Sequence, residues 1–399
     1  MKILVLNSGS SSIKYQVFEI DDRETLLAKG LIERIGLEGS ELRHSLPGGP
    51  DASWGKAVPD HNLAIGEILS LLTHPRLGVV KELRGIEGVG HRVVHGGERF
   101  AESVLVDDDV HTAIRDCCEL APLHNPPNLL GIEACRRLLP GVPQAAVFDT
   151  AFHQTMPQKA YAYAIPYQMY LKHKIRRYGF HGTSHMYVSR EAARALGKPV
   201  EALKIITCHL GNGCSVAAVN AGVSVDTSMG FTPLEGLVMG SRSGDLDPYV
   251  PLYLMERERM GIPEMSDFLN KRSGLVGICG KKDMRDILED AERGERPALL
   301  AVEVFTYRVA KYIGAYAMAM NGVDAIVFTA GMGERSAAIR SRILSYASFL
   351  GLDLDEERNA RGETILSTPG SRVAALMIHT DEELVIARDT HRLITARAR

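Results

Sequence analysis

A strand, a polar turn and a second strand occur twice in this chain, about 200 residues apart, and this repetition constrains the fold most. Near the N-terminus the apolar run ILVL leads into NSGSSS and then into the alternating segment IKYQVFEI. Far downstream, LKIITC leads into HLGNG and then into CSVAAVNAG. Short apolar runs bounded by glycine and small polar residues are typical of strands joined by turns. The spacing is too long for a solenoid and predicts two related domains.

The remaining pattern favours an α/β class. Single cores stop growing at about 250 to 300 residues, so a chain of 399 residues agrees with two domains. The apolar segment 298–322 predicts a long helix that ends at Asn321 and Gly322, followed by a buried strand in DAIVFTAGMGE. A helical segment is expected near residues 62–73, and a domain junction near residue 150. Thr380 and Glu383 have the spacing of a capping box, which predicts a terminal helix.

Charge and composition exclude several classes of protein. With 45% hydrophobic and 24% charged residues, the chain has the composition of an ordinary globular protein. A net charge of -3 gives no general attraction for nucleic acid or acidic membranes, so neither partner is expected. The N-terminal run has the features of neither a signal peptide nor an anchor. Six cysteines without CxxC spacing argue against disulfides and zinc, and favour a cytoplasmic location.

Three turns combine glycine with small polar residues after an apolar strand: NSGSSSIK, HLGNG and TAGMGE. Glycine lets backbone N–H groups approach phosphate oxygens, and Lys14 in the first turn adds a point charge. The chain has no GxxxxGK[ST], and no turn completes GxGxxG. Taken one at a time, such turns are more often ordinary connections. Together they predict a nucleotide held between two domains by turns from each.

Several charged side chains lie in contexts typical of loops. Arg92 lies in GHRVVHGG and Arg242 in MGSRSGDLDP, so each half of the chain offers one arginine for an anion. An isolated arginine is more often a solvated charge or an ion pair. Asp149, His181 and His185 lie among aromatic and glycine neighbours in FDTAFH and YGFHGTSH. This set indicates a site that binds anions.

These strings occur together in one order with further motifs, namely PLHNPPN, DTSMGFTPLEGL and EELVIARDT, and the chain thereby closely resembles the acetokinase family over essentially its whole length. The resemblance implies two duplicated domains of the actin/Hsp70-like (ribonuclease H-like) fold with an interdomain cleft for ATP, and usually a homodimer. It implies an N-terminal domain of residues 1–150 plus a C-terminal helix of residues 384–399. Residues 151–383 would form the C-terminal domain, which carries most of the nucleotide site.

The activity implied by the resemblance is reversible phosphoryl transfer from MgATP to acetate, a carboxyl acceptor, giving acetyl phosphate and ADP. Mg²⁺, or Mn²⁺ in its place, would be held with help from Asn7 and Glu382. The implied catalytic residues are Arg92, Asp149, His181 and Arg242. The implied acid pocket comprises Arg92 for the carboxylate and an apolar set for the methyl group: Val94, Leu123, Phe180 and Pro233. ATP would contact Lys14 and three segments: His209, Leu210, Gly211, Asn212 and Gly213; Asp283, Met284 and Arg285; Gly331, Met332, Gly333, Glu334 and Arg335.

Three motifs depart from the family's usual pattern, and the resemblance implies that all three lie around the nucleotide. Arg335 stands where asparagine is expected, HTDEEL replaces PTNEEL, and two lysines precede Asp283. These departures bear on base preference and ATP affinity, while the implied catalytic set is complete.

A carboxylic acid with a pKa of about 4.3 is already an anionic nucleophile near neutral pH, so no general base is needed. Catalysis must then depend on position and on cations that match the charge of the transferring phosphoryl group. We therefore expect Asp149 to orient Mg²⁺ or a catalytic arginine and not to remove a proton.

Three other functions are compatible with parts of this pattern. Propionate or another short-chain acid could replace acetate with the same motifs. An ATP-driven switch of the Hsp70 or actin kind would share the fold but would not need two arginines and an apolar pocket. A metal-dependent hydrolase could use His91, His95, His181 and His185, but their spacing matches no known ligand set.

Overall fold

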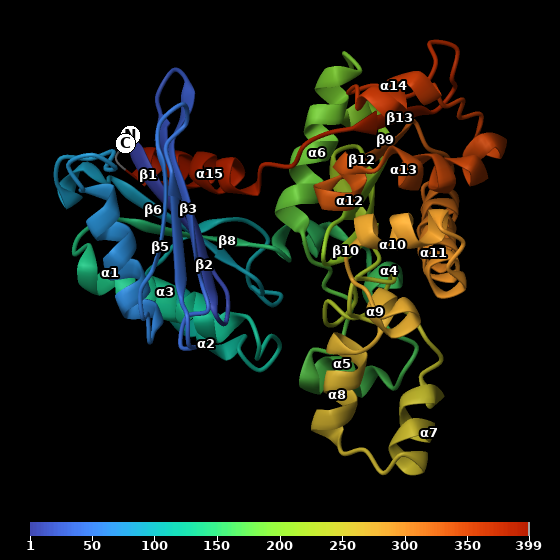
Figure 1. The fold of residues 1–399 in the computed structure, drawn as a ribbon, viewed down its shortest axis with the longest axis horizontal. Helices are drawn as coiled ribbons and strands as arrows, with labels where there is room; N and C mark the ends of the chain where they lie inside the picture. Colours follow the sequence, from blue (N-terminus) through green and yellow to red (C-terminus); the bar gives the residue numbers. More distant parts are fainter. Residues whose placement is uncertain (398–399) are drawn as a thin grey trace. The chain divides into compact units, whose positions relative to one another are not determined.

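The computed structural model describes residues 1–397, and these form two compact units, each built on one β-sheet (Figure 1). Unit 1 comprises Met1–Phe152 together with the C-terminal segment from Asp381. Unit 2 comprises His153–Thr380. Within residues 1–397, no helix combines the length and the apolar character needed to cross a membrane.

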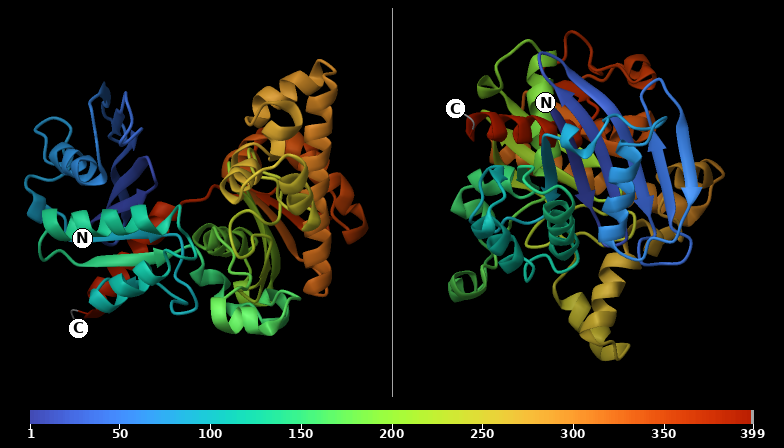
Figure 2. Two further views of the ribbon diagram at one scale, coloured as in Figure 1. Left: turned by 90° about the horizontal axis from the view of Figure 1, so that it is seen from below. Right: turned by 90° about the vertical axis from the view of Figure 1, so that its left-hand side faces the viewer.

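Unit 1 contains a sheet of eight strands in the order β5-β4-β3-β2-β1-β6-β8-β7, which twists along its length (Figure 2). The strands are β1 (Lys2–Ser8), β2 (Ser12–Ile20), β3 (Glu24–Glu33), β4 (Glu41–Ser45), β5 (Asp51–Gly55), β6 (Gly88–Val93), β7 (Val104–Leu105) and β8 (Gln144–Phe148). The helices are α1 (His61–Leu72), α2 (Asp108–Asp116), α3 (Asn125–Leu138) and α15 (Glu382–Arg397).

The apolar run at the start of the chain is explained by burial on both faces of this sheet. Leu4 and Leu6 belong to a core cluster that includes residues of α1 and α3. Ile3 and Val5 belong to a second cluster, which includes Ile386 of α15. Successive side chains of a strand point to opposite faces, so a strand covered on both sides must be apolar at every position.

Unit 2 contains a sheet of five strands in the order β11-β10-β9-β12-β13. The strands are β9 (Lys204–Leu210), β10 (Cys214–Asn220), β11 (Val223–Thr227), β12 (Ala325–Thr329) and β13 (Ala374–Met377). The helices are α4 (Gln158–Tyr161), α5 (Tyr167–His173), α6 (Gly182–Ala195), α7 (Tyr249–Arg257), α8 (Ile262–Lys271), α9 (Gly274–Cys279), α10 (Met284–Glu292), α11 (Arg296–Ala319), α12 (Ala330–Arg335), α13 (Ala337–Leu344) and α14 (Glu356–Arg361).

The two sheets share one topology. In unit 1, β1 pairs antiparallel with β2 and β2 antiparallel with β3, while β6 is parallel to both β1 and β8. In unit 2, β9, β10, β11, β12 and β13 repeat this order and these directions. The predicted α/β class with two duplicated domains of the actin/Hsp70-like fold is therefore confirmed.

The predicted long helix is confirmed as α11, which begins with a proline in its first turn and ends before Asn321 and Gly322, both at positive φ. The helix expected near residues 62–73 is α1.

The prediction for the C-terminal helix needs correction. It begins at Glu382 and not at residue 384, and the predicted residues 398–399 lie outside the described part of the chain. The predicted capping role of Thr380 is wrong, because the Asp381 carboxylate accepts from the Leu384 N–H at 3.0 Å. The Thr380 hydroxyl instead hydrogen-bonds with Ser184 at 2.9 Å. Asp is a strong N-cap residue, so α15 is capped one residue later than the capping-box pattern predicts.

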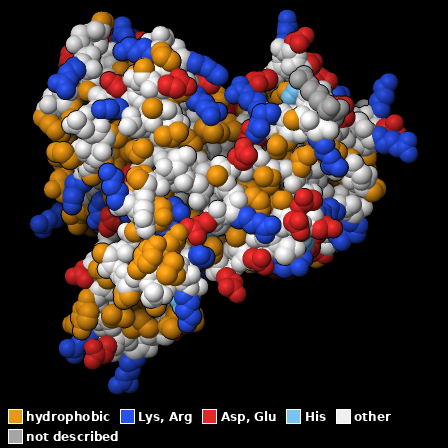
Figure 3. All heavy atoms as spheres, turned by 180° about the vertical axis from the view of Figure 1, so that it is seen from behind, with side chains coloured by type: hydrophobic (Ala, Val, Ile, Leu, Met, Phe, Trp, Pro, Cys, Tyr) orange, Lys and Arg blue, Asp and Glu red, His pale blue; other side chains and the backbone are white. Residues whose placement is uncertain are grey.

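Apolar side chains are exposed on α7 and α8 of unit 2, which form the lower-left lobe of Figure 3. The exposed members of this group include Tyr249, Leu252, Tyr253 and Ile262, each exposed by 48% or more. An exposed apolar surface of this kind is typical of an interaction site.

Candidate active site

In unit 1, Arg92 and Asp149 form a bidentate ion pair. Arg92 lies near the end of β6, and Asp149 directly follows β8, which is parallel to β6. The carboxyl ends of parallel strands meet at one sheet edge, which explains why these distant residues are neighbours. Arg92 Nε donates to Asp149 Oδ1 at 3.0 Å, and Nη2 donates to Oδ2 at 2.5 Å. The fork geometry of the guanidinium is thereby matched by one carboxylate.

Asn7 joins this pair from the end of β1. Its side-chain Oδ1 accepts from Arg92 Nη1 at 3.2 Å, so three strand ends contribute to one cluster. Asp149 is only 1% exposed. Burial tends to lower the pKa of the Arg92 guanidinium, but the charges of Asp149 and Glu382 outweigh this effect and raise it. Arg92 therefore stays charged, and its orientation is set by Asp149.

Glu382 brings a further carboxyl group into the electrostatics of this cluster from the start of α15. Burial, followed by repulsion from Asp149 and Glu383, raises the pKa of Glu382 to about 7, although Arg92 and Lys14 act in the opposite direction. A nearby cation would favour the ionised form of Glu382. Asn7 and Glu382 thus supply oxygen donors of the kind that Mg²⁺ prefers. Within the described residues, however, no group of three His, Cys, Asp or Glu side chains could hold a metal by itself.

Lys14, predicted to contact ATP, forms an ion pair with Glu383 at 2.5 Å between Nζ and Oε1. Glu383 was not among the predicted site residues. The only signal was its place in the EEL motif, directly beside the predicted metal ligand Glu382. The ion pair orients Lys14 toward the start of α15.

In unit 2, His181 stacks on His209 with ring centroids 4.1 Å apart. His181 precedes α6 with a left-handed backbone (φ 56°), which is uncommon for a non-glycine residue. Its Nδ1 hydrogen-bonds with Ser215 Oγ at 2.9 Å, and the same hydroxyl hydrogen-bonds with His185 Nε2 at 2.7 Å. The ring orientation of His181 is therefore set by β10 as well as by its own backbone.

His185 lies behind this pair and is fully buried. Its Nδ1 hydrogen-bonds with Thr207 Oγ1 at 2.7 Å, in addition to the bond with Ser215. Burial, with repulsion from His153 and His209, lowers the pKa of His185 well below the ordinary value, so the ring is neutral. Both ring nitrogens thus have protein partners, which is the environment of a structural histidine. Ser215 and Thr207 were missed from the sequence because a lone serine or threonine in a strand carries no distinctive signal.

Gly213 lies where His181 and Arg242 approach one another. A Cβ added at this glycine would stand 3.3 Å from His181 Cε1 and 3.6 Å from Arg242 Nη1. Glycine therefore lets an imidazole and a guanidinium lie beside the same backbone position, where a Cβ would be in tight contact with the imidazole. This is a suitable environment for a small anion.

Arg242 is held differently from Arg92. Its Nη1 donates to the Pro233 carbonyl at 3.0 Å and lies 3.8 Å from the Met239 sulfur. Among the described residues, no carboxylate forms an ion pair with Arg242, and burial lowers the pKa of its guanidinium. Arg242 still carries its charge near neutral pH, because an arginine pKa starts so high. This positive charge is available to a bound anion.

Two hollows of about 540 and 570 Å³ adjoin these residues in unit 2. The first is lined by Asn212, Gly213 and Arg242 among others. The second is lined by parts of all three predicted ATP segments: Gly211, Asn212, Asp283, Met284, Arg285, Gly331, Met332 and Arg335. Asn212 and Lys282 line both hollows, and Lys282 was not predicted as a site residue. The three segments are therefore brought together around the second hollow.

Glu334 holds the third of these segments in shape. Its carboxylate accepts from the backbone N–H of Ala330 at 2.9 Å and of Thr380 at 3.2 Å, and it pairs with His379 at 2.8 Å. Burial alone would raise the pKa of Glu334, but these hydrogen bonds outweigh burial and lower it. The buried Arg340, absent from the predicted site, donates to the carbonyls of Gly333 and Glu334 at 2.9 and 2.8 Å. Glu334 and Arg340 are thus supports of this turn.

The four residues predicted to line an apolar acid pocket divide between the units. Val94 in unit 1 is buried, and its backbone N–H donates to Asn128 Oδ1 at 3.0 Å, whereas Leu123 is 65% exposed. Phe180 in unit 2 is buried, and Pro233 is half-buried on the loop that carries Arg242. The pocket itself stays a prediction.

The histidines of the hydrolase alternative also divide between the units. His91 is buried in unit 1 and hydrogen-bonds with Gln144 at 2.7 Å, and burial lowers its pKa to about 4. His181 and His185 belong to unit 2, where both hydrogen-bond with Ser215. These partners favour structural roles for His91 and His185.

Comparison with known proteins gives one consistent result. The model of the Acetokinase family matches residues 2–388. An acetate kinase of Thermotoga maritima is 60% identical over 400 residues, covering 99% of each chain. The crystal structure of Porphyromonas gingivalis acetate kinase has a TM-score of 0.94 at 45% identity, covering 98% of this chain and 99% of the other. A propionate kinase from Francisella tularensis has a TM-score of 0.92 at 43% identity, with the same coverage.

Proposed function

The chain belongs to the acetokinase family, and from this membership we propose that it catalyses reversible phosphoryl transfer between MgATP and acetate, giving acetyl phosphate and ADP. The observation that carries the proposal is the environment of Arg242. This guanidinium has no carboxylate partner among the described residues, and it lines the hollow of about 540 Å³ together with Gly213, the glycine beside His181. Asn212, the residue before Gly213, lines both hollows where the predicted nucleotide segments meet. An ATP-driven switch would not need such a charge beside the phosphate loops.

Acetate needs orientation and charge compensation, not deprotonation, because it is an anion near neutral pH. Arg92 would bind the acetate carboxylate. Asp149 would hold Arg92 through Nε and Nη2, and the bidentate pair in unit 1 supports this orienting role. We therefore do not assign Asp149 as a general base.

During transfer, negative charge spreads over the equatorial oxygens of the phosphoryl group, and fixed cations there lower the barrier. Arg242 and His181 would serve this purpose from unit 2. His181 can bring Nε2 to a phosphoryl oxygen, because its Nδ1 is already engaged with Ser215. Both residues are anchored in the protein, so little reorganisation accompanies the reaction.

Mg²⁺ belongs to the proposal as the partner of the nucleotide phosphates, with Mn²⁺ as an alternative. Asn7 and Glu382 would hold it, since each offers an oxygen and their shared cluster is rich in negative charge. Bound there, the ion would neutralise negative charge on the nucleotide phosphates.

A second acid, propionate, is favoured by one observation: a propionate kinase is 43% identical with nearly full coverage. One methylene in an apolar pocket changes binding by only about 1 to 3 kcal/mol, so the two activities overlap. We propose acetate as the preferred acid, because the curated relatives at 54 to 60% identity are acetate kinases.

The proposal also includes a homodimer and a cytoplasmic location. The exposed apolar side chains on α7 and α8 support a protein partner such as a second copy. The six cysteines are all free thiols, which agrees with a reducing compartment.

The first test is MgATP consumption coupled to trapping of the acyl phosphate with hydroxylamine, run with acetate, propionate, butyrate and no acid. The highest kcat/KM is expected with acetate. A higher value with propionate would change the assigned acid. ATP hydrolysis that is indifferent to every acid would contradict the proposed function.

A further inference from the structure

The loop of residues 228–245 carries two of the proposed site residues, Pro233 and Arg242. It lies between β11, which ends at Thr227, and α7, which begins at Tyr249. Since it contains neither helix nor strand, side-chain contacts must determine its conformation. The positions of Pro233 and Arg242 depend on those contacts.

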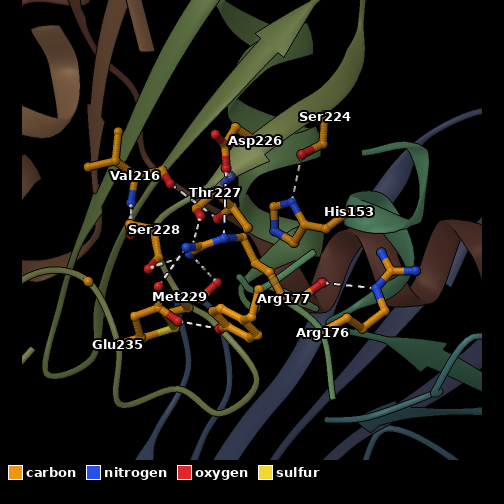
Figure 4. A network of polar contacts seen from close by, with 12 residues as sticks. His153, Arg176, Arg177, Val216, Ser224, Asp226, Thr227, Ser228, Met229 and Glu235 are labelled. Carbon is orange, nitrogen blue, oxygen red and sulfur yellow. Dashed lines mark hydrogen bonds and ion pairs between the residues drawn. The ribbon is translucent and has the colours of Figure 1, made fainter. Parts of the chain in front are cut away.

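Arg177 makes the densest set of these contacts, as Figure 4 shows. Its Nη1 donates to the carbonyls of Thr227, Ser228 and Met229, at 2.8, 3.1 and 3.3 Å. Its Nη2 donates to Glu235 Oε1 at 2.5 Å. The Arg177 side chain is only 17% exposed. One partly buried guanidinium therefore connects the start of the loop to a carboxylate several residues further along, a role suited to the rigid fork of arginine.

Tyr163 contacts the other oxygen of the Glu235 carboxylate, so that Arg177, Glu235 and Tyr163 together form a clamp on the loop. Its hydroxyl donates to Glu235 Oε2 and accepts from the backbone N–H of Phe231 at 2.9 Å. Burial, with the nearby charge of Glu235, raises the pKa of Tyr163, so the hydroxyl keeps its proton. A Cβ at residue 230 would overlap both the Glu235 carboxylate and the Tyr163 hydroxyl, so glycine here leaves room for their contact.

The clamp is connected directly to Arg242. Arg242 Nη1 donates to the carbonyl of Pro233, two residues before Glu235. The far end of the loop is closed by Asp245, which accepts from the Gly236 N–H at 2.7 Å and from Tyr312 at 2.7 Å. The segment that carries Pro233 and Arg242 is thus held at both ends, and Glu235 is the link at the near end.

We propose that Arg177, Glu235 and Tyr163 are positioning residues, which hold loop 228–245 so that Pro233 and Arg242 meet the acid and the transferring phosphoryl group. This inference rests on the proposed function. The three residues act through the loop and not on the substrates. Weakening the clamp should therefore reduce turnover and change acid preference, while ATP binding stays the same.

The kinetic test compares Tyr163→Phe with Tyr15→Phe. Both remove a hydrogen-bonded tyrosine hydroxyl, and that of Tyr15 bonds with His44 in unit 1 and takes no part in the clamp. For Tyr163→Phe, kcat with acetate should fall about tenfold, because the freed carboxylate no longer fixes the loop. KM for ATP should stay within about twofold, and the ratio of kcat/KM for propionate over acetate should change. Tyr15→Phe should leave all three quantities unchanged.

Glu235→Gln supplies a second variant of nearly the same shape, in which Arg177 loses the ion pair with Glu235 at 2.5 Å and keeps only the longer one with Asp226 at 3.9 Å. It should show the same pattern with a larger fall in kcat. A purely structural role would lower the amount of active enzyme without changing acid preference, because every correctly folded molecule would then be normal. Unchanged acid preference in both variants would overturn the proposal.

Hydrogen exchange separates this inference from the proposed function. The amides of residues 228–245 should exchange faster in both variants than in the wild type, while those of β9 and β10 keep their protection. If this exchange is unchanged, the clamp is refuted, whether or not the wild type uses acetate. If the wild type uses no acid but exchange rises in the loop, the proposed function fails and the clamp is supported.

Discussion

Arg92 in unit 1 and Arg242 in unit 2 are both half-buried arginines in a proposed site, but their partners differ. Arg92 donates two hydrogen bonds to the Asp149 carboxylate, whereas Arg242 donates to the Pro233 carbonyl. Burial tends to lower the pKa of both guanidiniums. At Arg92 the nearby carboxylates outweigh burial and raise the pKa, whereas at Arg242 burial prevails and lowers the pKa.

This difference suggests a division of tasks. A guanidinium already matched by a carboxylate is held in a fixed direction, which suits orientation of a substrate. A guanidinium held only by neutral groups keeps its charge for an anion, and it interacts most strongly when new charge develops next to it. A partly buried cation without a carboxylate is unfavourable for stability, so its retention favours a functional explanation.

The largest expected effect is the loss of kcat when Arg242 is replaced, which tests the task that distinguishes it from Arg92. Arg242→Ala should lower kcat by about 10³-fold or more, as arginines that stabilise phosphoryl transfer do. Steady-state kinetics in both reaction directions would measure it. Arg242→Lys, which keeps the charge but not the bond geometry, should recover part of the loss. A change confined to KM would contradict a role in the transition state.

The next test concerns Asp149, the partner of Arg92. Asp149→Asn keeps the shape but removes the charge, and kcat should fall about 10²-fold because Arg92 and the metal lose their orientation. Raised Mg²⁺ should recover activity, and the pH profile should keep its shape. If the variant lost the acidic limb of the profile at every Mg²⁺ concentration, Asp149 would be a general base and the orienting role would be wrong.

A third prediction uses the raised pKa of Glu382, about 7, which has no counterpart near Arg242. A proton and a metal ion compete for this carboxylate, so Mg²⁺ affinity should fall as pH drops below this value. The fall should approach about tenfold per pH unit. At pH values above the pKa of Glu382, the affinity for Mg²⁺ should be nearly constant. Titration calorimetry between pH 5.5 and 8.5 would measure this, with Glu382→Gln as the control that removes the dependence.

The smallest expected effect concerns the charge that surrounds the nucleotide in unit 2. Lys282 lines both hollows, so Lys282→Ala should raise KM for ATP about threefold at low salt, with kcat unchanged. Lys281→Ala is the matched control, because Lys281 pairs with Asp290. Equal effects of the two substitutions would mean that only the net charge of the segment matters.

Much of the fold was predictable because it depends on local pattern. The two strand-turn-strand segments became β1 with β2 and β9 with β10, since apolar runs and glycine turns act over a few residues. The implied start of α15 at residue 384 was two residues too late. The cap was assigned to Thr380 and not to Asp381, because both are acceptable caps and the choice depends on tertiary contacts such as the bond of Thr380 with Ser184. Of the proposed site, the motifs identified Arg92, Asp149 and Arg242, but Lys282 was missed because an exposed lysine resembles any other.

The sequence by itself determined the strands, the glycine turns and the chemical types of the site residues, because backbone conformation and side-chain chemistry are properties of short segments. Only the tertiary structure decided which charges are paired. Arg92 and Asp149 are 57 residues apart in sequence, and Arg177 and Glu235 are 58 residues apart. No local pattern specifies such partners, because they meet only when strands and loops from distant segments pack together. That pairing leaves Arg242, alone of these arginines, without a carboxylate among the described residues.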